Sequence, residues 1–128
     1  MFWNKLDGAV LFNKVFSYQV PIDKVDIFNM KLDRDGPKVI IEFDLIGHLP
    51  DNPPIKWPKK YNKCRCGINC FGVSDFNCSG LDVNMLGDIN ISNGNKVVIT
   101  GEAFKLSFSS KNIQLIGPSV YYDEDMLV

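Results

Sequence analysis

The segment from Lys63 to Cys70, KCRCGINC, holds three of the four cysteines in this chain of 128 residues. Cysteine thiolates can bind metals, form disulfides or act as nucleophiles. A zinc site commonly uses ligands separated by two residues, in pairs that converge on one centre. The spacing here is Cys-x-Cys-x3-Cys-x7-Cys, and no histidine lies nearby. The spacing therefore does not favour a metal centre, and we expect no metal and no cofactor.

The same cysteines fit the alternation of a β-strand, in which residues two apart share a face. Cys64, Cys66 and Cys70 would line one face of a strand, and Cys78 would follow on the next strand. Cysteine is among the most frequently buried residue types and packs as a small apolar side chain. We predict four buried thiols. A disulfide between Cys78 and a facing cysteine, or a reactive thiol, remains an alternative.

Other candidates for catalysis are few. His48 is the only histidine, and the sequence places no cysteine or serine within reach of it, so we predict a solvated loop residue. Asp33 and Asp35 lie in a turn segment, where aspartate is common because it hydrogen-bonds the local backbone. No glycine-rich phosphate loop is present between a strand and a helix. We predict no catalytic residues and therefore a protein that is not an enzyme.

Length and composition are those of one ordinary globular domain, which we place at residues 1–128. The net charge of −1 does not favour nucleic acid as a partner. Lys5 and Asp7 interrupt the segment where a signal peptide needs an apolar core, and the apolar runs are too short to span a bilayer. We expect a protein of the cytoplasm that does not associate with membranes.

The periodicity changes along the chain. Residues 1–16 have helical spacing, with Asn4 and Asp7 as start signals, although Gly8 interrupts the pattern. From Val25 onward apolar and polar residues alternate, and Phe28 would share a strand face with Met30 and Leu32. Asn93-Gly94 is a strong hairpin signal. The expected strands are residues 25–32, 39–45, 63–71, 76–81, 88–92, 96–100, 104–109 and 113–116, with the third and fourth forming a pair. The fold class is α+β and mostly antiparallel β: a twisted sheet or sandwich of about eight strands with an N-terminal helix.

Two segments depart from the even mixing of charge. IKWPKKYNKCR, residues 55–65, contains five basic residues and no acid, and YYDEDM, residues 121–126, gathers the opposite charge. Aromatic side chains beside charge of one sign are typical of protein interfaces, although a solvated loop and a solubilising tail fit these segments equally well. A single short basic patch offers few phosphate contacts. The candidate partner-binding residues are Lys56, Trp57, Lys59, Lys60, Tyr61, Lys63, Tyr122, Asp123, Glu124 and Asp125.

The order of segments resembles the Immunity protein 50 family of bacterial polymorphic toxin systems. The resemblance is carried by Trp3 in the N-terminal segment, VDIFNMKLDRDGPKVIIEFDL (residues 25–45), FGVSDF (71–76) and GEAFKLSF (101–108). It implies an immunity protein that remains in the cytoplasm and neutralises the toxic C-terminal domain of a cognate toxin by stoichiometric binding. It assigns no individual contact residue.

Three other classes remain open from the residues alone. A small-molecule or carbohydrate-binding β domain would use Trp57, Tyr61 and the C-terminal tyrosines to line a pocket. An enzyme would use a cysteine thiolate, and a structural subunit would form a stable homo-oligomer. The oligomeric state does not follow from the sequence.

Overall fold

The structure is a computed structural model that describes residues 1–124. It contains a 3-10 turn, η1 (Trp3–Lys5), a short helix, α1 (Val10–Val15), and eight strands. The strands are β1 (Lys24–Asp33), β2 (Lys38–Leu45), β3 (Lys63–Phe71), β4 (Ser74–Ser79), β5 (Leu86–Ser92), β6 (Lys96–Gly101), β7 (Lys105–Ser109) and β8 (Asn112–Tyr121).

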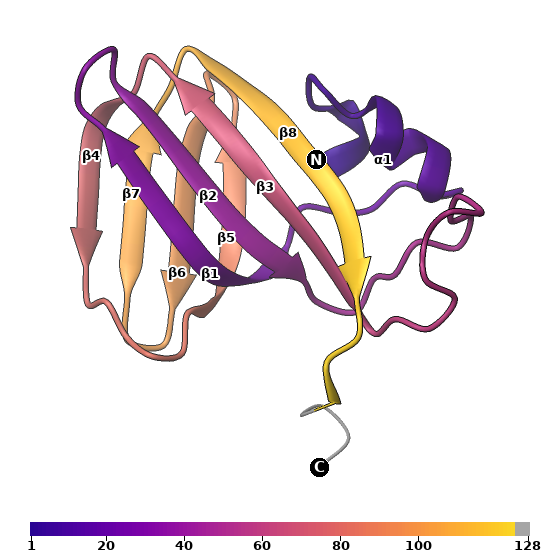
Figure 1. Ribbon diagram of the computed structural model, residues 1–128. Coiled ribbons are helices and arrows are strands. Elements are labelled where there is room, and N and C mark those ends of the chain that lie inside the picture. The colour runs from indigo at the N-terminus through magenta and orange to yellow at the C-terminus, as the bar shows by residue number, and fades with distance from the viewer. Residues whose placement is uncertain (125–128) are drawn as a thin grey trace.

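All eight strands belong to one antiparallel sheet in the order β4-β7-β6-β5-β1-β2-β3-β8 (Figure 1). β1 joins the two halves of this sheet. It pairs with β2 along most of its length, but with β5 only over Lys24–Asp26. Beyond that junction the halves separate, so that β2, β3 and β8 lie in front of β5, β6 and β7 in Figure 1. The predicted fold class is confirmed, and the sheet is a single continuous one.

The core lies between the inner faces of the two halves. Phe43 and Ile68 of one half and Ile99 and Phe108 of the other are almost fully buried. Each such side chain contributes about 1.5–3 kcal/mol by leaving water. At one end the N-terminal segment closes the core, where the Trp3 ring lies 5.1 Å from that of Phe43.

The N-terminal segment is less helical than its periodicity predicts. The expected helix over residues 1–16 is wrong in extent, because η1 and α1 are separate elements and Gly8 stands between them with φ of +83°. A Cβ at this glycine would lie 2.8 Å from the Leu115 carbonyl oxygen. The break lets Asp7 run beside β8, where its carbonyl accepts from the Leu115 amide at 2.7 Å. Asn4 does not cap a helix; its carboxamide oxygen accepts from the Val20 amide (2.7 Å).

Within residues 1–124, no helix combines the length and apolar character required to cross a bilayer.

The expected pairing of the third and fourth strands is also wrong. β3 pairs with β2 and β8, whereas β4 pairs with β7 in the other half of the sheet. The link between them is short and turns at Gly72, which has φ of +63°. Alternation identifies both segments as strands, but it carries no information on which half of a folded sheet each one joins.

Candidate functional site

The two charged segments singled out in the sequence meet in the structure. β3 and β8 are neighbours, with Lys63 opposite Tyr121. Beyond the ladder, the Asn62 amide nitrogen donates to the Tyr121 carbonyl at 3.1 Å. The Asn62 side chain donates to the Asp123 carbonyl at 2.8 Å and accepts from the Asp123 amide at 2.7 Å. We call this surface the β3–β8 end, formed by residues 56–65 and 121–124.

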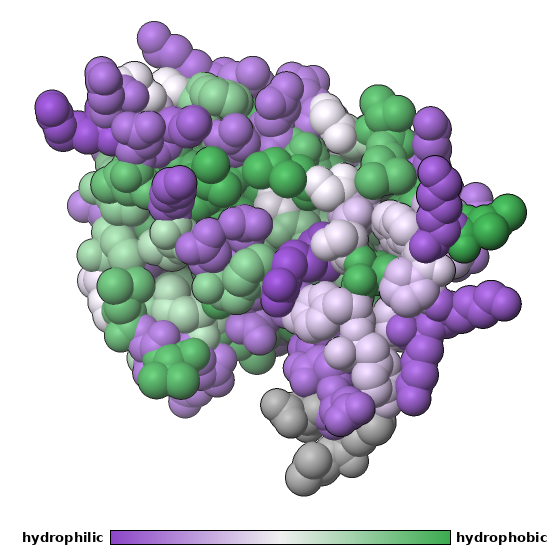
Figure 2. All heavy atoms as spheres, in the orientation of Figure 1, coloured by the Kyte–Doolittle hydropathy of each residue, from purple (hydrophilic) through white to green (hydrophobic). Residues whose placement is uncertain are grey.

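Most positive charge at the β3–β8 end is not neutralised. Lys56, Lys59 and Lys60 are exposed and Lys63 is half-buried. Among residues 1–124 the one ion pair within 4.0 Å is elsewhere on this surface, between Arg65 and Asp44. Figure 2 shows hydrophilic side chains projecting at this end of the molecule.

Of the C-terminal candidate residues, Tyr122 contacts the basic segment through its side chain. Lys60 Nζ lies 4.3 Å from the centre of the Tyr122 ring, a cation–π contact across the two segments. Asp123 is half-buried and Glu124 is exposed. Asp125 lies outside the described residues.

The two aromatic candidates of the loop between β2 and β3 hold that loop in place. Trp57 is half-buried and packs against the core. The Tyr61 hydroxyl donates to the Pro50 carbonyl at 2.7 Å. Asn52 fastens the same loop to the end of α1, since its amide donates to the Val15 carbonyl at 3.0 Å. The loop therefore presents its lysines from a fixed support.

A bulge in β1 creates a feature that the sequence does not predict. The register runs from Ile27 opposite Phe43 directly to Asn29 opposite Glu42, which leaves Phe28 without a partner. The expectation that Phe28 shares a face with Met30 is therefore wrong. A bulge adds one residue to a strand and reverses the faces beyond it, so Met30 packs against the core while Phe28 lies outside.

On the outer face Phe28 covers Arg65. The Arg65 Cζ lies 3.6 Å from the centre of the Phe28 ring and 4.5 Å from that of Tyr121. Its Nη2 donates to the Tyr121 hydroxyl at 3.1 Å, and this hydroxyl donates to Asp44 Oδ2 at 2.7 Å. Arg65 Nε lies 3.5 Å from Asp44 Oδ1. We call these four side chains the arginine clamp.

The electrostatics of the arginine clamp follow from its burial. Asp44 is buried, whereas 37% of the Arg65 side chain is exposed. Burial, the hydrogen bond to Asp44 and the charge of that carboxylate raise the pKa of Tyr121 to about 12, and Arg65 acts in the opposite direction. Tyr121 therefore stays protonated at neutral pH and donates to the carboxylate. Of the four residues, Arg65 and Tyr121 belong to the two segments that the sequence marks by their charge, whereas Phe28 and Asp44 do not.

The cysteines divide into two kinds. Cys64, Cys66 and Cys70 are buried on the inner face of β3, as predicted, but Cys78 is exposed, and the prediction is wrong there. Its strand, β4, is an edge of the sheet and is exposed over most of its length. All four thiols are free. A hydrogen bond with Cys64 and burial raise the pKa of Cys66, and burial raises that of Cys70 to about 12, so both are poor nucleophiles at neutral pH.

His48 lies in the loop after β2, as predicted, and is half-buried. Its Nδ1 lies 3.2 Å from the Tyr18 hydroxyl in a contact that is exposed to solvent. In the described part of the chain, no group of three or more His, Cys, Asp or Glu side chains is placed to hold a metal ion.

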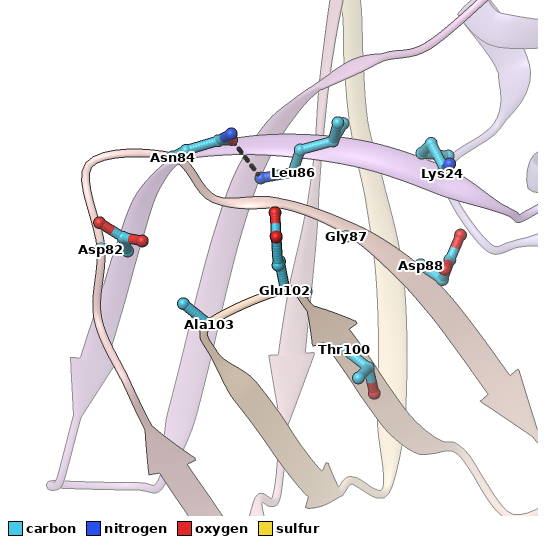
Figure 3. A pocket seen from close by; sticks show the side chains of 10 residues that line it. Lys24, Asp82, Asn84, Leu86, Gly87, Asp88, Thr100, Glu102 and Ala103 are labelled. Atoms are coloured by element: carbon cyan, nitrogen blue, oxygen red, sulfur yellow. Dashed lines mark hydrogen bonds between the residues drawn. The ribbon is translucent and has the colours of Figure 1, made fainter.

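A hollow of about 590 Å³ lies at the start of β5 and the end of β6 (Figure 3). Its charged side chains are those of Lys24, Asp82, Asp88 and Glu102. The Asn84 carboxamide oxygen accepts from the Leu86 amide at 3.1 Å along its rim. Within residues 1–124, no aromatic side chain lines this hollow, Trp57 and Tyr61 included, so its described lining does not offer the ring surface expected of a carbohydrate site.

The fold and these surfaces define a small antiparallel β protein. Its arginine clamp and the lysines of the β3–β8 end lie on the outside of the sheet. The chain belongs to the Immunity protein 50 family, whose family model matches residues 8–121. This confirms the resemblance drawn from the sequence. Neither a curated protein nor a solved structure matches the chain.

Proposed function

We propose that this protein neutralises the toxic domain of a cognate bacterial toxin by binding it in a stoichiometric complex in the cytoplasm. The observation that carries this proposal is the family match, which extends over residues 8–121 and therefore over all eight strands. Immunity proteins of this kind generally act by binding and not by catalysis. The raised pKa values of Cys66 and Cys70 agree with such a role.

The β3–β8 end is the surface that we assign to the toxin. Its exposed lysines, Lys59 and Lys60 among them, stand on a loop fixed by Trp57 and Tyr61. A rigid surface loses little conformational entropy on docking, which favours tight binding. Unpaired charge at its rim speeds encounter with a surface of opposite sign and selects among partners.

Growth rescue with co-purification tests the function directly. The protein is co-expressed with the C-terminal domain of any large toxin-like protein encoded just upstream of it. We expect growth to be restored and a one-to-one complex to elute as a single species. A toxin domain from another system serves as the specificity control and should remain toxic. Absence of both rescue and complex, with the toxin domain active when expressed alone, would overturn the proposal.

A further inference from the structure

We propose that Arg65 anchors the bound toxin, with its guanidinium receiving a carboxylate from an acidic segment of the toxin domain. Lys60 and Lys63 attract that segment to the clamp. This inference rests on the proposed function and names both the contact and the chemistry of the partner.

The guanidinium is held in position but retains hydrogen-bonding capacity. Phe28 and Tyr121 flank it, its Nη2 donates to the Tyr121 hydroxyl, and the Asp44 carboxylate attracts its Nε side at 3.5 Å, so its orientation is set before a partner arrives. Within residues 1–124, no hydrogen bond engages its Nη1 group, and 37% of the side chain is exposed. An arginine presents donors in a planar fork that matches the two oxygens of a carboxylate. A guanidinium already fixed in this way loses little entropy when it binds.

The charge around the clamp indicates an acidic partner. Asp44 balances the charge of Arg65 itself. Lys63 lies two residues before Arg65 on the same strand and hence on the same face, and Lys60 stands over Tyr122. Lys60 and Lys63 have no described carboxylate within 4.0 Å. Among the described residues of the β3–β8 end, the lysines at 56, 59, 60 and 63 outnumber the acids Asp123 and Glu124, so an acidic segment would meet an excess of positive charge there before it reaches the arginine.

The outer face favours a protein over a nucleic acid. Asp26 lies opposite Asp44, which in turn lies opposite Arg65, so carboxylates share the arginine's row across the sheet. These carboxylates would repel a run of negative charges laid along the row, as a phosphate backbone requires, so the arginine accepts one carboxylate side chain while the rest of the acidic segment lies over the lysines of the rim. Phe28 is 45% exposed and Ile116 is 39% exposed, which adds apolar area of the kind found at the centre of protein interfaces. Figure 2 shows apolar and polar side chains interleaved over this face.

The test measures binding of four variants to the toxin domain that co-purifies with the wild-type protein. Arg65→Lys keeps the charge but loses the planar fork, and Phe28→Leu keeps an apolar residue but removes the ring. We expect each to raise Kd about tenfold or more, mainly through faster dissociation. Lys63→Gln should slow association several-fold at low salt and much less at high salt. Lys105→Gln, at an exposed position of β7 in the other half, is the matched control and should bind as wild type.

Hydrogen exchange of the wild-type complex provides a readout that does not depend on the stability of any variant. We expect new protection in the β3–β8 end, residues 56–65 and 121–124, when the toxin domain is bound. Wild-type binding with no protection there, or with Kd unchanged in both clamp variants, would overturn the inference and leave the proposed function intact. Competition by a single-stranded oligonucleotide that Arg65→Lys weakens, or self-association of the free protein that requires Arg65, would overturn it too. Failure of the wild-type protein to bind the toxin would instead contradict the proposed function.

Discussion

Replacement of Cys70 by serine tests whether the cysteine-rich strand is a packing element. Cys70 is fully buried, and its register neighbours on β2 and β8 are Val39 and Ile113, both buried. No polar side chain lies directly across from it. A serine hydroxyl placed there without a partner costs about 1–3 kcal/mol of unfolding free energy. With a urea m-value of about 1–3 kcal/mol/M, the midpoint should fall by roughly 1 M.

Urea unfolding followed by fluorescence measures this effect, with two comparison variants. Cys70→Ala loses the sulfur contacts but introduces no polar group, so we expect it to be less destabilised than Cys70→Ser. Cys78→Ser changes an exposed thiol and should remain within about 0.5 kcal/mol of wild type. If Cys70→Ser is as stable as Cys78→Ser, then the site accepts a hydroxyl, and its assignment to an apolar core would be wrong.

Three further outcomes are expected. In the folded protein a thiol reagent should modify Cys78 rapidly and the other three cysteines only after unfolding; two fast thiols by mass spectrometry would contradict the burial of β3. Because the pKa of Tyr121 is raised from 10 to about 12, the unfolded chain loses this proton first, so stability falls as pH rises between these values. In Tyr121→Phe the urea midpoint should fall less steeply with pH over that range than in the wild type. The same pH dependence in both proteins would count against the hydrogen bond to Asp44. Lys59→Glu with Lys60→Glu should slow association with the toxin domain and leave Tm nearly unchanged, whereas equal rates would remove the loop from the interface.

The strands could be predicted because apolar and polar residues alternate along them, and this alternation indicates which side chains are buried. The hairpin of β5 and β6 is the clearest case: Ile89 and Ile91 alternate with polar residues before Asn93-Gly94. The loop has three residues between the paired Ser92 and Lys96, and its Gly94 and Asn95 have positive φ values of +83° and +58°. The inner face of β3 follows from the same rule. Each of these predictions depends only on residues close together in the sequence.

Features that depend on residues far apart could not be predicted in this way. The bulge at Phe28 changes which face the following residues occupy, yet an apolar residue at this position fits either face. Cys78 is a cysteine like the three buried ones, and it is exposed because it lies on the edge strand β4. The sequence identifies the basic segment and the acidic segment separately. They lie side by side only because β3 pairs with β8, with Lys63 opposite Tyr121.

The two faces of β3 have different consequences for function. Successive residues of a strand point to opposite sides, so Arg65 stands between Cys64 and Cys66 while its own side chain lies outside. Both cysteines are buried in a close-packed core, and β3 pairs with β2 on one edge and with β8 on the other, where the register shifts beside Cys66. The backbone that carries Arg65 is therefore fixed from three directions. A change in volume at Cys66 would shift that backbone, and with it the guanidinium, because close-packed interiors transmit strain. The cysteines of this strand thus bear on partner binding through the position of the arginine between them, without a thiol taking part.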